Sequence, residues 1–202
     1  MRFKSKPPNL LGKDYALRQL SHQELVLPYW LSHLRDFLNS QFAAAYDQTY
    51  SADQLKTWIS KCNESFVVLV KKTYFSTEYF EEEIVATVKI FPLIDDFVSR
   101  FEVFDAYNVK PAWLACNFDR AKAVWVGDLV STNSNLLYLL MVVERKVENL
   151  SVPIYCRTII DQLRNILLER YGATILRDKK PRPARETVLI FRPKPTKKDY
   201  GL

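Results

Sequence analysis

Apolar residues in the first third of the chain recur at the spacing of amphipathic helices. Residues 21–24, Ser-His-Gln-Glu, have the form of a capping box, in which a serine hydroxyl and a glutamate carboxylate bond the free amides at a helix start. A helix is predicted to follow, because apolar side chains then recur at Leu31, Leu34, Leu38, Phe42 and Ala45. Residues 51–54, Ser-Ala-Asp-Gln, repeat the signature and predict a second helix that runs to about Cys62.

The period then changes from helical to strand-like. Residues 65–70 and 84–91 are apolar runs rich in β-branched side chains, and they predict two strands that pair as a hairpin. The stretch between them, 72–83, is polar and aromatic, and it is too long for a tight turn. It ends in three consecutive glutamates, residues 81–83, which we interpret as a solvated tip.

The second half of the chain alternates between strand and helix patterns. Gly172 is the expected left-handed stop of the last helix. The predicted strands are 123–130, 152–156, 173–177 and 187–192, and the predicted helices are 136–149 and 158–171. Residues 92–122 give a weak signal and are predicted to form an irregular insertion, which holds a short helix or a packed segment and a candidate strand at 113–116.

The composition fits one packed domain. The 202 residues are 48% hydrophobic and 13% aromatic, which excludes a mainly disordered chain. The three cysteines, Cys62, Cys116 and Cys156, are an odd number, so a reducing compartment is expected rather than a disulfide framework. The longest strongly apolar stretch, 136–143, is far shorter than the roughly 20 residues of a membrane span, and residues 1–13 lack the apolar segment of a signal peptide. We therefore expect a cytoplasmic protein with no membrane partner.

The formal charge of +6 is concentrated at the carboxyl end. Residues 177–202 contain nine basic and three acidic residues, which leaves 20 of each kind in the first 176. A basic segment of this kind attracts phosphates of nucleic acid, nucleotide cofactors or membranes. The alternative is a solvated hairpin and tail, because Phe191 and Tyr200 are too few aromatic residues for a base-stacking platform.

Two stretches of the sequence resemble the GNAT superfamily, whose members commonly transfer an acyl group from coenzyme A to an amine. Residues 44–46 and 50–58 are similar to the "AY…YSxEQLxxW" stretch that follows the first helix in many GNAT chains, and 167–173 resemble the "YxxxGF" end of the last helix. The resemblance covers about residues 14–193. It implies an α/β (α+β) fold with a mixed central sheet flanked by helices.

The expected domain organisation follows from that resemblance. Residues 1–13 are expected to be a flexible basic N-terminus, and 194–202 a basic C-terminal tail. Residues 14–193 are expected to be the acyltransferase domain, with 92–122 as the insertion.

The resemblance also places a coenzyme A site after the fourth strand. The family holds the pyrophosphate with an R/Q-x-x-G-x-G/A loop and the amides of the next helix, which favour a polyanion. The corresponding segment of this chain lacks both glycines and the arginine, so two interpretations stay open: a cofactor site built from hydroxyls and side-chain amides, and ordinary helix caps. The candidate cofactor-binding residues are Leu129, Val130, Ser131, Thr132, Asn133, Ser134, Asn135 and Leu136.

The catalytic groups implied by the resemblance are only partly present. The family's general acid, a tyrosine, falls at Leu168, and the polar residue at the helix start falls near Asp161. Tyr155 and Tyr171 are interpreted as core residues. Asp128 is the candidate general base, because a carboxylate beside the acyl donor can take a proton from an ammonium substrate; its alternative role is an ordinary hydrogen-bonded aspartate at a strand end.

The sequence therefore predicts an acyl-CoA-dependent N-acyltransferase that uses acetyl-CoA or another acyl-CoA and an amine acceptor of unknown identity. The alternative is a catalytically inactive GNAT-fold module that binds nucleic acid or an acidic partner through its basic end. No metal site is predicted, because His22 and His33 lack partners at the spacing of a zinc site or a catalytic triad. A phosphate-binding Walker loop is also missing from the sequence.

Overall fold

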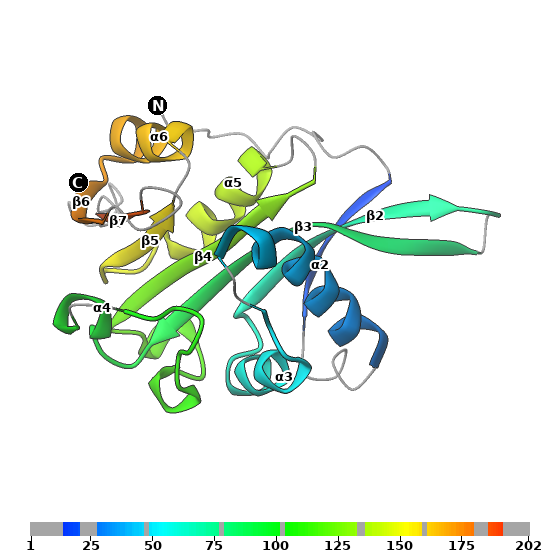
Figure 1. Cartoon of the computed structure of the whole chain (residues 1–202), viewed down its shortest axis with the longest axis horizontal. Helices are drawn as coiled ribbons and strands as arrows, with labels where there is room; N and C mark the ends of the chain where they lie inside the picture. The colour runs from blue at the N-terminus through cyan, green and yellow to red at the C-terminus, as the bar shows by residue number, and fades with distance from the viewer. Residues whose placement is uncertain are drawn as a thin grey trace, which may run out of the picture.

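The computed structural model of the chain describes eight segments: residues 14–20, 28–46, 49–76, 79–101, 104–132, 136–158, 161–179 and 186–191. The strands are β1 (Tyr15–Gln19), β2 (Phe66–Tyr74), β3 (Phe80–Leu93), β4 (Ala123–Ser131), β5 (Ile154–Thr158), β6 (Thr174–Lys179) and β7 (Glu186–Phe191). The helices are α2 (Pro28–Tyr46), α3 (Ala52–Lys61), α4 (Phe97–Arg100), α5 (Leu136–Val147) and α6 (Asp161–Tyr171), with short 3₁₀ turns η1 (Pro111–Trp113) and η2 (Phe118–Arg120). Figure 1 shows their arrangement around one sheet.

The seven strands form one mixed sheet in the order β1-β2-β3-β4-β5-β7-β6. Neighbouring strands are antiparallel except for β4 and β5, which are parallel. A parallel pair needs a crossover, and here α5 supplies it. The mixed α/β sheet flanked by helices is the fold class that the sequence predicts.

Local signals locate several elements correctly. Ser51 caps α3, since its hydroxyl accepts a hydrogen bond of 3.1 Å from the Gln54 amide. Gly172 follows α6 with φ +63°, the left-handed conformation expected of a C-terminal stop. The capping box at 21–24 lies outside the described residues. Strand β1 was not predicted, and it exists as an edge strand paired with β2.

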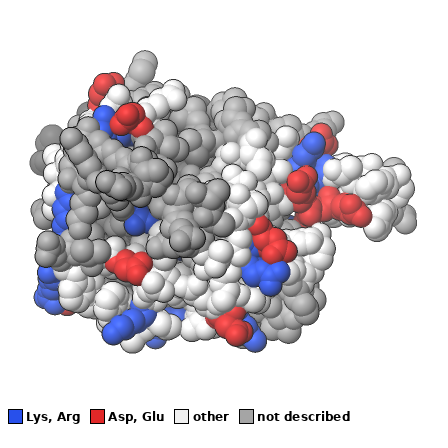
Figure 2. All heavy atoms as spheres, in the orientation of Figure 1, with Lys and Arg blue, Asp and Glu red and all other residues white. Residues whose placement is uncertain are grey.

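The interpretation of residues 81–83 as a solvated tip is wrong, and the connection between the two strands is shorter than 72–83. Strand β2 continues to Tyr74 and β3 begins at Phe80, so the glutamates lie within a strand ladder, and Glu82 pairs with Lys72 across the two strands. The Glu82 side chain is only 8% exposed, because Arg18 and Lys72 both form ion pairs with it. Figure 2 shows charged side chains of both signs where this hairpin leaves the body of the molecule.

Residues 92–122 contribute to the core as well as to the surface. Pro92 and Leu93 complete β3, and the rest contains α4, η1 and η2. The candidate strand at 113–116 is reduced to one isolated bridge, between Leu114 and Leu93. Phe104 and Tyr107 are buried against one face of the sheet.

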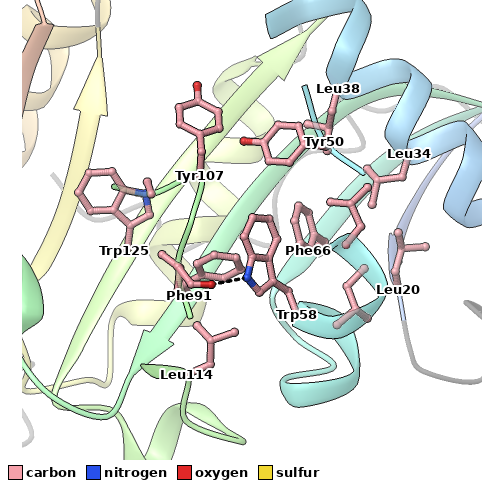
Figure 3. Packing of buried hydrophobic residues seen from close by; sticks show 14 of the residues in the cluster. Leu20, Leu34, Leu38, Tyr50, Trp58, Phe66, Phe91, Tyr107, Leu114 and Trp125 are labelled. Atoms are coloured by element: carbon pink, nitrogen blue, oxygen red, sulfur yellow. Dashed lines mark hydrogen bonds between the residues drawn. The ribbon is translucent and has the colours of Figure 1, made fainter. Parts of the chain in front are cut away.

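Each face of the sheet has its own hydrophobic cluster. Helices α2 and α3 and the segment 104–114 cover the first face, with Trp58, Phe91 and Trp125 in its centre (Figure 3). Helices α5 and α6 cover the second face. Burial on this scale drives folding, since each large apolar side chain contributes about 1.5–3 kcal/mol. Among the described residues, no helix is both long and apolar enough to span a membrane.

Cys156, in the second cluster, makes the stability of the protein sensitive to alkaline pH. Burial raises the pKa of its thiol from 9.0 to about 12. The native state therefore holds the proton that the unfolded chain releases, and stability present below pH 9 is lost as the pH rises toward 12, up to about 4 kcal/mol for three pH units. We expect Cys156→Ala to flatten the fall of the unfolding free energy over that range in urea titrations.

Cys116→Ala is the matched control, because Cys116 is exposed. It should leave the alkaline fall unchanged. Equal flattening in both variants would contradict the assignment to Cys156.

Candidate active site

Strands β4 and β5 separate toward their carboxyl ends. Their parallel pairing ends with Val126 opposite Cys156, although β4 continues to Ser131 and β5 to Thr158. Beyond that point β4 stays paired with β3, and β5 with β7. The backbone edge of β4 after Val126 is therefore not bonded to β5.

A β-bulge lies at the point of separation. Lys89 of β3 is opposite Gly127 and Thr87 is opposite Val130, so Val88 alone faces the two residues 128 and 129. Asp128 has φ +50°, a left-handed conformation that non-glycine residues seldom adopt. Regular alternation would place the Asp128 side chain on the face of Val126, whereas the bulge turns it to the face of Trp125 and Lys89.

Gly127 makes room for the side chains beneath the bulge. A Cβ atom at this position would lie 2.8 Å from Nε1 of Trp125 and 3.7 Å from Cε of Lys89. The first of these distances is too short for a non-bonded contact. Glycine at 127 therefore lets the Trp125 indole and the Lys89 stem pack under the strand.

Asp128, Lys89 and Tyr50 form a bonded group, which we call the Asp128 cluster. Lys89 Nζ forms an ion pair of 2.8 Å with Asp128 Oδ2, and the Tyr50 hydroxyl donates a 2.8 Å hydrogen bond to the same oxygen. Lys89 Nζ also donates to the Tyr50 hydroxyl at 3.3 Å. Asn39 of α2 fixes Tyr50 through both its backbone groups. Lys89 of β3 and Tyr50, which directly precedes the Ser51 cap of α3, thus meet at the Asp128 carboxylate of β4.

The Lys89 ammonium is fully buried and enclosed by aromatic rings. Its side chain is 0% exposed, and Nζ donates to the Ala106 carbonyl at 3.2 Å. Four ring centroids lie 5.1–5.3 Å from Nζ, close enough for cation–π attraction. These rings belong to Tyr50, Trp58, Phe91 and Tyr107, and Figure 3 shows them gathered on one face of the sheet.

The electrostatics of the cluster follow from its burial. Desolvation lowers the pKa of Lys89, and the Asp128 carboxylate opposes that change. The pKa of Tyr50 is raised, first by burial and then by the adjacent carboxylate. Tyr50 therefore stays a neutral hydrogen-bond donor. The Arg157 guanidinium from β5 lies 4.9 Å from the Tyr107 ring and brings a second cation to this face.

Comparison with known proteins decides the fold family. No protein-family model matches the sequence, and no curated protein matches it. Solved structures do match. The loading GNATL domain of CurA from Lyngbya majuscula superposes with a TM-score of 0.55 at 12% identity, over 88% of this chain and 97% of that domain. An acetyltransferase of the GNAT family from Listeria monocytogenes gives 0.51 at 11% identity, over 88% and 94%.

This chain has the GNAT fold. A third match is the NatC complex bound to Gag peptide and coenzyme A, with a TM-score of 0.55, 10% identity and coverage of 89% of this chain and 98% of the matched one. The TM-scores of 0.51–0.55 establish a shared fold, and identities of 10–12% limit the likeness to the fold.

The GNAT loop segment is described only in part. Leu129, Val130 and Ser131 form the half-buried end of β4, and Leu136 begins α5. The Thr132 amide and hydroxyl both donate to the Val85 carbonyl, at 2.9 and 3.2 Å, so these two donors are used within the sheet. The remaining candidates, Asn133, Ser134 and Asn135, lie outside the described residues.

Other residues singled out in the sequence have structural contacts. Tyr155 is 1% exposed, and its hydroxyl donates to Asp96 at 2.8 Å. Leu168 and Tyr171 pack against the second hydrophobic cluster. Asp161, at the start of α6, forms an ion pair of 3.1 Å with Arg164. Among the described residues, no group of three histidine, cysteine, aspartate or glutamate side chains is arranged to hold a metal ion.

Sequence reasoning located Asp128 and missed its partners. The sequence does contain a signal for one of these partners, because Lys89 is the one charged residue in the apolar run 84–91. A charge in such a run is buried only with a partner. Tyr50 and Tyr107 carried no comparable signal, since aromatic residues are ordinary core residues.

Proposed function

We propose that this chain is an acyl-CoA-dependent N-acyltransferase in which Asp128 is the general base. The observation that carries the proposal is the bulge that turns a carboxylate inward where β4 and β5 separate. In this sheet, the edge of β4 that is no longer paired with β5 lies beside the Asp128 carboxylate, which can accept a proton. Holding donor and acceptor side by side supplies much of the rate in such a reaction.

The acyl-CoA would lie along β4. An extended chain that contains amides can bond to an exposed strand edge, and β4 offers such an edge after Val126. The diphosphate would then reach the amino end of the 12-residue helix α5, where free amides and the helix dipole favour anions. Leu129 to Leu136 are the proposed contacts, with Asn133, Ser134 and Asn135 included as sequence candidates.

The reaction would proceed by direct transfer. The nitrogen of a neutral amine attacks the thioester carbonyl, a C–N bond forms and the C–S bond breaks. The amine proton passes to Asp128, directly or through water, and coenzyme A leaves as a thiolate that takes a proton from solvent. Both described contacts of Asp128 use Oδ2, and a carboxylate has about four lone-pair positions, so Oδ1 is the acceptor we assign.

A second candidate function is a binding module without catalysis. Two observations favour it. The Asp128 carboxylate already accepts hydrogen bonds from Lys89 and Tyr50, and the Thr132 amide and hydroxyl both donate to the Val85 carbonyl. In that case the basic segment 177–202 would contact nucleic acid or an acidic partner.

Titration calorimetry with acetyl-CoA separates these functions. For an acyltransferase we expect saturable heat and, with a panel of primary amines, release of free thiol. Heat without thiol release from any amine would favour the binding module. Absence of heat at high acetyl-CoA concentration would reject the acyltransferase, and nucleic-acid binding that weakens steeply with salt would then support the alternative.

A further inference from the structure

Lys89 is a buried cation whose polar contacts converge on the proposed base. It lies on β3, two residues before Phe91, and reaches across to β4 beneath Gly127. Its ammonium contacts the Asp128 carboxylate, the Tyr50 hydroxyl and the Ala106 carbonyl. A lysine ammonium has three protons to donate, so these contacts satisfy it. A charged ammonium is costly to bury, and this buried ammonium lies against Asp128, the proposed general base.

The surroundings of Lys89 favour its charged form. A carboxylate at 2.8 Å attracts the ammonium, and the faces of four aromatic rings add cation–π attraction. Both act against the desolvation that lowers the pKa of Lys89. The titratable or charged groups that face it are Tyr50, Asp105, Tyr107, Asp128 and Arg157.

The same contact holds an unfavourable backbone conformation. Asp128 has φ +50°, and a residue held outside its usual backbone regions costs on the order of 1–3 kcal/mol unless its surroundings fix it. The Lys89 ammonium attracts the Asp128 carboxylate to the face of the sheet on which Lys89 itself lies. Without that cation, the carboxylate loses the ion pair that holds it on this face of the sheet.

We propose that Lys89 is a positioning residue for acyl transfer, which holds the Asp128 carboxylate in place and turned toward the amine acceptor. This inference rests on the proposed function, because it assigns Lys89 a role in that reaction. Lys89 itself takes no part in bond making, since its ammonium stays enclosed.

The first test is the kinetics of acyl transfer in Lys89→Met. We expect kcat to fall roughly tenfold or more, because a misplaced base slows the chemical step rather than donor binding. The KM for acetyl-CoA should stay unchanged, because the donor is held elsewhere. Lys72→Met is the matched control: Lys72 also has a carboxylate partner, Glu82 at 3.7 Å, and an aromatic ring, Phe80 at 4.5 Å. It should change neither quantity.

A folded Lys89→Met variant with the wild-type kcat would overturn the inference and leave the proposed function intact. The second test needs no turnover: the side-chain ¹H–¹⁵N signal of the Lys89 ammonium should be present near neutral pH in the wild type and lost in Asp128→Asn, where burial is no longer opposed by a carboxylate. A missing wild-type signal, or one that persists in Asp128→Asn, overturns the inference even where Lys89→Met does not fold. If no amine is acylated but this signal behaves as expected, the proposed function is wrong. The contact between Lys89 and Asp128 is then still supported.

Discussion

Asp128→Ala is expected to lower the free energy of unfolding by about 3–5 kcal/mol near neutral pH. The substitution leaves the Lys89 ammonium fully buried without its counter-ion. The loss has an upper limit, because burial lowers the pKa of Lys89 and the ammonium can release its proton when its counter-ion is removed. The measurement is the change in urea midpoint at constant m value.

The double variant Lys89→Met/Asp128→Leu should recover most of that loss, because replacing a whole buried ion pair by apolar side chains is often neutral. Glu64→Ala is the surface control. Glu64 pairs with Lys146 at the same 2.8 Å distance but is 46% exposed, so its loss should cost less than about 1 kcal/mol. Equal losses in Asp128→Ala and Glu64→Ala would show that solvent screens the buried pair.

Trp58→Ala is the second substitution with a large expected effect, about 3–5 kcal/mol of unfolding free energy. The indole is 1% exposed and contacts the rings of Phe66 and Phe91 and the Lys89 ammonium. Its N–H also donates to the Val109 carbonyl at 2.8 Å (Figure 3). The variant loses both the packing and that hydrogen bond, and chemical unfolding measures the sum.

Trp58→Phe and Trp125→Phe separate the hydrogen bond from the packing. Both indoles are 1% exposed, but among the described residues the Trp125 N–H has no hydrogen-bond partner. Trp58→Phe leaves the Val109 carbonyl without its donor, so it should lower the free energy of unfolding by about 1–2 kcal/mol more than Trp125→Phe does. The opposite order would contradict the importance we give to the Trp58 hydrogen bond.

Elements with strong local signals were predicted from the sequence. The Ser51 cap and the Gly172 stop depend on nearest neighbours along the chain, which the sequence displays directly. Strand β1 depends on a distant partner: its five residues carry no decisive alternation, and they become a strand by pairing with β2. The outer part of the β2–β3 hairpin was missed for a similar reason, because Glu82 forms its ion pairs with Arg18 and Lys72 on other strands.

The candidate site divides in the same way. Asp128 was proposed because it lies on the strand that the resemblance places beside the acyl donor. Its partners are remote in sequence, since Tyr50 is 78 residues away and Lys89 lies 39 residues from Tyr50. The bulge depends on how β3 and β4 align, and a single-residue shift in that alignment would send the Asp128 side chain to the other face.

The single parallel contact in the sheet has a mechanical consequence. Strands β1 to β4 form one antiparallel block and β5 to β7 form another, and three register pairs of β4 and β5 join the two within the described part of the chain. Backbone hydrogen bonds cross that seam over a short length only, and the two hydrophobic clusters, each with residues of both β4 and β5, add side-chain packing across it. Small rotations of one block against the other would widen or narrow the unpaired edge of β4 without breaking the ladders inside either block.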